Sequence, residues 1–385
     1  MTDRPYLFNL DRDQLHQLIA QIGMPAYRAD QVLDWVYRKF VADPRKMTNL
    51  STVDRDRLGE AIDFTRGHIV RHQQATDETQ KLLLKWEGGS RKSEVGGATA
   101  HTLPTSDFPL PTSPTSECVM IPAESHASGK PRRTACISTQ VGCPVGCRFC
   151  ASGLGGLETN LTAGHIVEQV FHLNACLNPK PQASKPDTIT HIVFMGMGEP
   201  LANFDATTRA VRLLMAEWGF NLSGRRITVS TVGLPAPMRR LADMGLPVTL
   251  AISLHAPNDA LRRQLIPWAE HTPIEKIIDA GRYYFDRTGR EVTLEYILLR
   301  GVNDRPQQAK QLADLSRQLR SSVNLIRYNE VAGLPYQRPD DEDVRRFQSI
   351  LQKANVNVHI RASRGRYIAA ACGQLRHEAA TANGG

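Results

Sequence analysis

Three closely spaced cysteines are the residues of this sequence best suited to bind a metal. Cys143, Cys147 and Cys150 are separated by three and then two residues, and Phe149 stands just before the last of them. Thiolates are soft ligands that select iron–sulfur clusters, zinc or copper. A 4Fe–4S cluster held by only three thiolates would keep one iron open. The spacing therefore favours a cluster whose open iron can bind a substrate or a cofactor.

A zinc site is the alternative for the same three cysteines, with Cys136 or a distant residue as the fourth ligand. A disulfide framework is disfavoured, because the 385-residue chain has seven cysteines, an odd number, and no recognisable signal peptide. Thiolates and an oxygen-sensitive cluster require reducing conditions, so we expect a cytoplasmic protein. No apolar run approaches the length that spans a bilayer, so we expect no membrane association.

A glycine-rich loop at 196–200 follows an apolar stretch at 189–195. Gly196 and Gly198 would let a ligand approach the backbone closely, and the carboxylate of Glu199 could receive an ammonium group. The loop lacks the spacing of a Rossmann or P-loop nucleotide site. It is therefore a candidate binding loop of another kind.

The elements that would position these residues form a repeating pattern. Strands alternate with amphipathic helices from residue 134 onward, and the strands are expected at 134–138, 189–195, 226–230, 248–254, 292–299, 323–326 and 356–360. Such alternation predicts a parallel sheet, open or closed into a barrel. Reacting groups of these folds lie in the loops after the strands. Ser230, 253–255 and Asn329 fall there, as do both loops described above, so we expect a single active site.

The first 66 residues read as a small helical unit. Asp11 can cap one helix, and a second is expected over 27–40. This second helix carries Trp35 and Tyr37 among basic residues, a mixture that suits phosphate contact and base stacking. For each aromatic residue alone, ordinary packing is the favoured interpretation, whereas the unit as a whole is a plausible RNA-contacting accessory domain.

Strands are expected within 67–90 and at 117–122, with a change of composition between them. Thr, Ser, Pro and Gly dominate from about 88 to 116. Such a segment cannot bury a core, so we expect a disordered linker or an inserted loop.

The formal net charge of +8 suggests a polyanionic partner, most simply nucleic acid. A merely basic solvated surface would give the same charge. The candidate basic groups are Arg225–Arg226, Arg239–Arg240, Arg262–Arg263, Arg361, Arg364 and Arg366.

Ordered motifs along nearly the whole chain resemble the RlmN/Cfr family of radical S-adenosylmethionine (SAM) RNA methyltransferases. The matching segments are 133–143, 196–201, 230–231, 253–258, 301–304, 324–326 and 370–375. The resemblance implies an α/β fold, a partial (β/α) barrel with a small N-terminal helical accessory domain. It divides the chain into 1–66, a strand region at 67–122 that includes the 88–116 insert, and a catalytic barrel at 123–385.

The resemblance also implies two cofactors, a 4Fe–4S cluster and SAM. The cluster ligands would be Cys143, Cys147 and Cys150. The SAM-binding site would be lined by Gly198, Glu199, Ser230, Ser253, Leu254, His255 and Asn329.

Three further residues receive catalytic roles from the resemblance. Cys372 would carry a methyl group taken from one SAM, and a radical derived from a second SAM would remove hydrogen from it. The carbon would then add to adenine, and Glu117 matches the family's proposed proton acceptor. Cys136 would attack the sulfur of Cys372, which releases methylated RNA as a disulfide forms.

The implied products are 2-methyladenosine in the peptidyl-transferase region of 23S rRNA and 2-methyladenosine just 3′ of the anticodon in tRNA. The implied partners are these RNAs and an electron donor such as a flavodoxin-type protein, with the enzyme a monomer. The alternative is Cfr-like methylation of carbon 8, although Pro200 favours carbon 2. A remoter alternative is a non-catalytic, zinc-stabilised RNA-binding protein. The basic stretch 365–369 departs from the acidic family pattern, a change that concerns how RNA is held.

Overall fold

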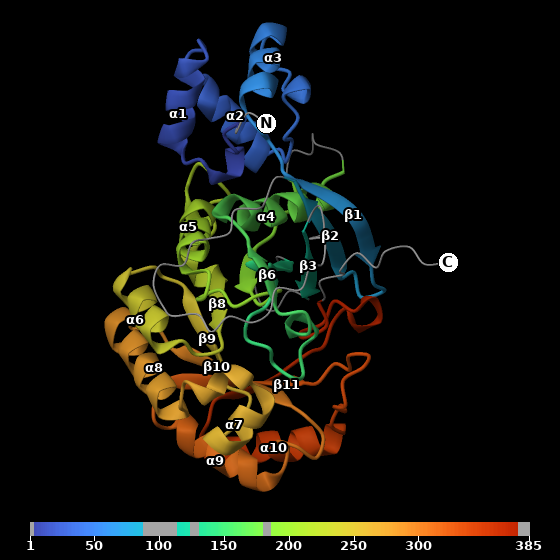
Figure 1. Ribbon diagram of the computed structural model, residues 1–385, viewed down its shortest axis with the longest axis vertical. Helices are drawn as coiled ribbons and strands as arrows, with labels where there is room; N and C mark the ends of the chain where they lie inside the picture. The colour runs from blue at the N-terminus through green and yellow to red at the C-terminus, as the bar shows by residue number, and fades with distance from the viewer. Residues whose placement is uncertain (1–3, 88–113, 124–130, 180–185, 376–385) are drawn as a thin grey trace, which may run out of the picture.

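The computed structural model describes residues 4–87, 114–123, 131–179 and 186–375. A ten-stranded sheet runs through this described part in the order β1-β2-β3-β4-β7-β8-β9-β10-β11-β12 (Figure 1). The strands are β1 Gly67–Gln74, β2 Gln80–Trp86, β3 Thr115–Ala123, β4 Arg132–Cys136, β7 His191–Phe194, β8 Ile227–Thr231, β9 Thr249–Ser253, β10 Val292–Leu298, β11 Ser321–Arg327 and β12 Val358–Arg361.

The sheet is parallel from β4 to β12, which confirms the prediction from strand–helix alternation. The strand order does not return to its start among the described residues, so the barrel is partial. The helices that connect or follow these strands are α4 Ala163–Leu177, α5 Phe204–Met215, α6 Pro235–Asp243, α7 Asp259–Leu265, α8 Ile274–Thr288, α9 Pro306–Ser316 and α10 Asp341–Lys353. No described helix is both long and apolar enough to cross a membrane.

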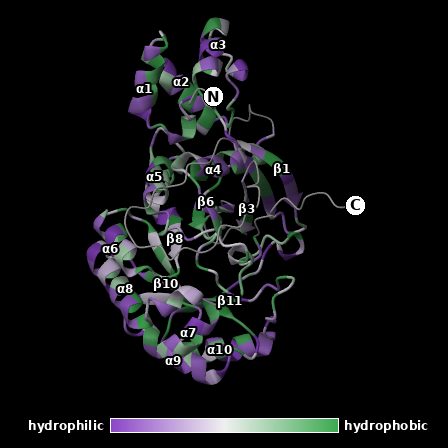
Figure 2. Cartoon of the chain, viewed as in Figure 1, coloured by the Kyte–Doolittle hydropathy of each residue, from purple (hydrophilic) through white to green (hydrophobic). Residues whose placement is uncertain are grey.

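The apolar core lies between the sheet and these helices. Their mixed hydrophobic and hydrophilic colouring in Figure 2 reflects one side packed on the strands and one side facing water. In β8, for example, Ile227 and Val229 are fully buried. Burial of this kind is the main stabilising contribution to a fold and fixes where the strand ends lie.

Strands β1 to β4 extend the sheet with antiparallel pairing. The expected linker lies largely at 88–113, outside the described residues. Its predicted end at Ser116 was wrong, because Thr115 and Ser116 already belong to β3 and pair with β2. The Trp86 indole donates a hydrogen bond of 2.9 Å to the Ser116 hydroxyl, which ties the two strands together at this point.

The N-terminal unit contains α1 Arg12–Gln21, α2 Arg28–Tyr37 and α3 Thr52–Ala61, drawn in blue in Figure 1. Asp11 caps α1 as expected, whereas α3 was not predicted. Trp35 and Tyr37 are buried. The Tyr37 ring packs against Trp218 and Phe220 of the barrel domain, so these two aromatic residues are packing residues and do not offer a surface for RNA bases.

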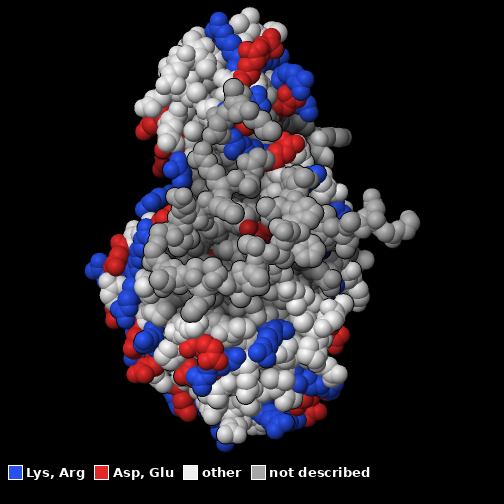
Figure 3. Space-filling model, in the orientation of Figure 1, with Lys and Arg blue, Asp and Glu red and all other residues white. Residues whose placement is uncertain are grey.

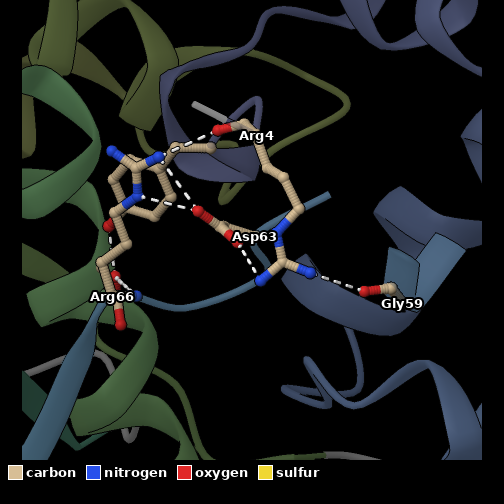
Figure 4. Close-up of polar contacts among 6 residues, drawn as sticks. Arg4, Gly59, Asp63 and Arg66 are labelled. Carbon is tan, nitrogen blue, oxygen red and sulfur yellow. Dashed lines mark hydrogen bonds and ion pairs between the residues drawn. The ribbon is translucent and has the colours of Figure 1, made fainter. Parts of the chain in front are cut away.

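Ion pairs within this unit and a buried carboxylate of α4 hold the unit against the barrel. Asp63 forms ion pairs with Arg4 at 2.6 Å and with Arg66 at 3.0 Å (Figure 4). Glu168 of α4 is fully buried and accepts hydrogen bonds from the backbone amides of Arg66 and Gly67, at 3.0 and 2.9 Å. The Tyr6 hydroxyl and the His172 ring also contact its carboxylate. Glu168 therefore anchors the connection between the N-terminal helices and β1.

We expect Glu168→Ala to lower the free energy of unfolding by about 3 kcal/mol or more, because each buried donor left without an acceptor costs about 1–3 kcal/mol. Urea unfolding followed by circular dichroism measures this loss. The exposed Glu275→Ala in α8 is the matched control and should change stability by less than about 0.5 kcal/mol. Equal unfolding midpoints for the two variants would contradict the anchoring role.

Candidate active site

The three cysteines at 143, 147 and 150 line one cavity of about 150 Å³. Their loop begins after β5 (Gln140–Gly142), which pairs with β6 (Leu157–Asn160). Gly142 has a φ of +73°, and a Cβ atom there would lie 2.0 Å from the Gly156 carbonyl oxygen. Only glycine fits this position, and the close approach holds the start of the cysteine loop against β6.

The cavity suits a cluster better than a single ion. Burial raises the pKa of all three thiols, that of Cys143 to about 12, so they become thiolates only when a metal replaces their protons. Nowhere in the described ranges do three His, Cys, Asp or Glu side chains converge on one metal ion. The three thiols line one shared cavity, and this donor set fits an iron–sulfur cluster.

The glycine-rich loop after β7 forms another wall of the same cavity. Gly198 has a φ of +103°, and a Cβ atom there would lie 2.7 Å from the Cβ of Gln140. Glu199 is buried, and its carboxylate accepts backbone hydrogen bonds from Val232 at 2.7 Å and Leu201 at 3.0 Å. Burial raises the pKa of Glu199 to about 7. A bound ammonium group would offset the cost of burying this carboxylate as an anion.

Most of the other predicted SAM residues also reach this cavity. Ser230 and Ser253 line it with their hydroxyls 3.3 Å apart. His255 lines it with its Nδ1 accepting the Ile297 amide at 3.1 Å, and burial lowers the pKa of His255 to about 3, so the ring is neutral. Leu254 is fully buried beneath the cavity wall. Asn329 does not line this cavity but lines a second one, and its side-chain amide donates a hydrogen bond of 3.3 Å to the Cys372 carbonyl.

Cys372 lies at the junction of two cavities. It lines the one that holds the cysteine loop, and it also lines a second, larger cavity of about 940 Å³. The cysteine loop holds the segment after Cys372 directly. The Ala151 amide donates to the Gly373 carbonyl at 2.8 Å, and the Ser152 hydroxyl donates to the Leu375 carbonyl at 2.8 Å.

Cys136 ends β4 and packs in a small apolar cluster with Val119, Ala370 and Leu375. Burial raises the pKa of the Cys136 thiol to about 12, and the guanidinium of Arg361 opposes this rise. Burial lowers the pKa of Arg361, but the neighbouring Cys372, Glu295 and Cys136 outweigh this effect and raise it. Since Cys136 packs with Ala370 and Leu375, it lies beside the segment that contains Cys372.

Glu117 does not line either cavity. It lies on β3, buried, with its carboxylate 2.8 Å from the ammonium of Lys81. The sequence analysis did not single out Lys81, because nothing local to β2 indicates what its side chain meets.

The second cavity is basic. Its charged lining residues are Arg132, Arg226, Arg361 and Arg364, and no Asp or Glu is among the described residues that form it. His191 also lines it, and burial together with the neighbouring arginines lowers the pKa of His191 to about 4. The sequence analysis did not count Arg132 or His191 as site residues. The only signal was the basic sequence at 130–133, and Arg132 of this sequence begins β4.

The other basic candidates lie away from this cavity or are already paired. Arg262 is buried, and its guanidinium donates to the carbonyls of Leu254, Thr272 and Val232, so it braces the first cavity from behind. Arg240 pairs with Asp205 on the surface. Basic and acidic side chains are interspersed over the visible described surface in Figure 3. The basic cavity next to Cys372 is therefore the better candidate site for a polyanion.

Comparisons with known proteins agree with this arrangement. The profile of the "Ribosomal RNA large subunit methyltransferase N-terminal domain" matches residues 6–63, and that of the "Radical SAM superfamily" matches residues 137–313. A "Probable dual-specificity RNA methyltransferase RlmN" of Salinibacter ruber is 41% identical over 98% of this chain and 95% of its own length. A "Ribosomal RNA large subunit methyltransferase N" of Nitrosopumilus maritimus is 41% identical over 98% of this chain and 99% of its own.

The same agreement holds for a solved structure. The crystal structure of a radical SAM methyltransferase from Sphaerobacter thermophilus superposes with a TM-score of 0.84 at 40% identity, and covers 97% of this chain and 99% of that one.

Proposed function

Since the chain belongs to the RlmN family of radical SAM RNA methyltransferases, we propose that its two cavities are the cofactor site and the RNA site of an adenosine methyltransferase. The proposed product is 2-methyladenosine, formed in 23S rRNA and in tRNA. The observation that supports this most directly is the position of Cys372, which faces both cavities at once. A thiol in that place can receive a methyl group on one side and deliver its carbon on the other.

In the first cavity, Cys143, Cys147 and Cys150 would hold a 4Fe–4S cluster, and the Glu199 carboxylate would receive the ammonium of SAM. The cluster and SAM together supply the one-electron chemistry that removes a hydrogen atom from an unactivated methyl group. The protein's own contribution there is to bind, orient and exclude water. The Cys372 thiolate would attack the SAM methyl group, so that a new sulfur–carbon bond forms as the sulfonium bond breaks.

In the second cavity, the adenine must be unstacked to reach Cys372. Arg132, Arg226 and Arg364 would neutralise nearby phosphates. After the carbon has joined the ring and the resulting adduct radical has given up one electron, Glu117, which lies on β3 outside the lining of both cavities, would accept the ring proton. The Cys136 thiolate would form a disulfide with Cys372 as the bond from Cys372 sulfur to the transferred carbon breaks. That carbon takes up a proton, and a reductant must restore the two thiols.

The same proposal covers the features that only the family pattern supports. The chain would act as a monomer in the reducing cytoplasm, with a flavodoxin-type protein as electron donor. Residues 1–66 would contact RNA as an accessory domain, 67–122 would form the antiparallel strand region, and 123–385 the catalytic barrel.

The test is an anaerobic reaction of iron-loaded protein with SAM, a reductant, and either an unmodified 23S rRNA fragment or unmodified tRNA. Mass spectrometry of the digested RNA should reveal 2-methyladenosine from both substrates. 8-Methyladenosine would support the Cfr-like alternative instead. If SAM were cleaved but neither RNA was methylated, the proposed substrate would be wrong.

Arg226→Gln should weaken RNA binding and reduce the slope of log affinity against log salt by about 1, because one phosphate contact is lost. Arg226 is exposed at the mouth of the basic cavity. Filter binding at several salt concentrations measures the slope. The control is Arg240→Gln on α6, which should leave the slope unchanged because the Arg240 cation is already paired with Asp205 of α5. The same slope for both variants would argue against the cavity as the phosphate site.

A further inference from the structure

The hairpin of β1 and β2 holds the chain just before Cys372. The Asp77 carboxylate accepts the Gly365 amide at 3.0 Å, and the Lys81 ammonium donates to the Ala369 carbonyl at 3.3 Å. Gly365 has a φ of +67°, and a Cβ atom there would lie 2.8 Å from the Thr79 side chain. The hairpin is therefore closely fitted to a segment almost 300 positions later in the chain.

Lys81 makes a second contact from the same ammonium, the ion pair with Glu117 at 2.8 Å. The Lys81 and Glu117 side chains are only 9% and 6% exposed. Little solvent is available to either charge, so the two side chains form a closely held ion pair. Removal of the ammonium would take away the contact that fixes the orientation of the Glu117 carboxylate.

The strand register places these groups on one face of the sheet. Lys81 is opposite Val119, and Val119 is opposite Cys136. Glu117 is two residues from Val119 on β3, so its side chain points to the same face. Ala370 packs against Val119 and Cys136 on that face. The Lys81 ammonium therefore lies where β2, β3 and the segment before Cys372 meet.

The backbone of Ala369 adopts an unfavourable conformation that its contacts must stabilise. Ala369 has a φ of +50°, a left-handed conformation that is unfavourable for a residue with a Cβ atom. Its carbonyl is the group that Lys81 contacts. On the other side of Cys372, the cysteine loop already holds Gly373 and Leu375. Cys372 is thus fixed from both sides, by the cysteine loop after it and by the hairpin before it.

We infer that Lys81 is a positioning residue for the methylation reaction, which aligns the Glu117 carboxylate with the segment that carries Cys372. This inference rests on the proposed roles of those two residues. Lys81 contacts neither cavity, so it acts through Glu117 and the Ala369 carbonyl. The part of the reaction that needs both Cys372 and Glu117 in place depends on Lys81. Methyl transfer from SAM to Cys372 depends mainly on the cysteine loop and does not require Lys81.

The test compares Lys81→Gln, Lys81→Arg and the control Lys85→Gln, an exposed lysine on the same strand. Intact-protein mass spectrometry measures the methylated Cys372 formed with SAM, and RNA mass spectrometry measures product. Lys81→Gln should form methylated Cys372 within about 3-fold of the wild type, yet lose about 100-fold in RNA product, as expected for a misaligned reacting group. Lys81→Arg should restore most of the product, and Lys85→Gln should match the wild type.

Two further measurements separate positioning from a general loss of structure. Deuterium at carbon 2 of the target adenosine should slow product formation by the Lys81→Gln variant more than by the wild type. The reason is that removal of this hydrogen as a proton becomes rate-limiting in the variant. In a Glu117→Gln background, Lys81→Gln should cost less than about 5-fold, because the double variant removes both charges of the buried pair. An equal loss in both backgrounds, or unchanged product from Lys81→Gln, would overturn the inference. Absence of product from the wild type would instead refute the proposed function.

Discussion

Cys372→Ala is expected to abolish RNA methylation while leaving iron content and SAM binding unchanged. The side chain faces both cavities, but the cluster would be held by three other thiols, and the Gly373 and Leu375 carbonyls that fix this segment belong to the backbone. Loss of a covalent nucleophile typically costs about 10⁴-fold or more in rate. The measurements are the visible absorbance of the anaerobically loaded protein and mass spectrometry of the RNA product.

The control for this variant is Cys176→Ala. Cys176 lies on α4, packs against the main core and lines neither of the two cavities. It should retain full methylation. An active Cys372→Ala enzyme would exclude a methylated thiol as an intermediate and would require direct transfer to the ring. Loss of iron together with activity would instead show that Cys372 serves the cluster site.

The sequence was sufficient to predict where the first cavity lies. The strand–helix alternation implied a common edge for the carboxyl ends of the parallel strands, and that edge brings together the cysteine loop, Glu199 and His255. These residues belong to loops whose positions follow directly from the strands before them. The strand pattern therefore carried most of the information about the fold and about this part of the site.

The second cavity could not be predicted in the same way. Arg361 lies at the carboxyl end of β12, as the rule for parallel strands predicts, but Arg132 enters the cavity from the start of β4, where the rule places no reacting group. Arg262 looked like any exposed basic residue in the sequence, yet its guanidinium is buried among three carbonyls. Which arginines remain available to RNA is decided by tertiary packing, which a local pattern does not record.

The contact between β2 and the segment before Cys372 could not be predicted from the sequence either, for a related reason. The β2 segment reads as an ordinary strand, and Lys81 would pass for a solvent-facing residue of an antiparallel hairpin. It is buried only because a segment from the other end of the chain covers it. A contact between such distant positions leaves no periodic trace in either stretch.

Cys136→Ala is expected to stall the reaction with protein covalently joined to RNA. The variant keeps Cys372, Glu117 and both cavities, so the carbon can still pass from Cys372 to adenine. No second thiol then remains in the apolar cluster that contains Ala370 and Leu375, since Cys136 is the one cysteine of that cluster among the described residues. Denaturing gel electrophoresis should reveal a protein–RNA band that resists reducing agents, because the link is a thioether.

Cys118→Ala is the matched control. Cys118 neighbours Glu117 in the sequence but faces the main core on the opposite side of β3, so it should release product normally. Nuclease and protease digestion of the Cys136→Ala band should yield a nucleoside attached to a peptide that contains Cys372. Free methylated RNA at wild-type yield would refute the resolving role. Attachment at any cysteine other than Cys372 would show that a different thiol carries the carbon, even though Cys372 alone among the seven cysteines lines both cavities.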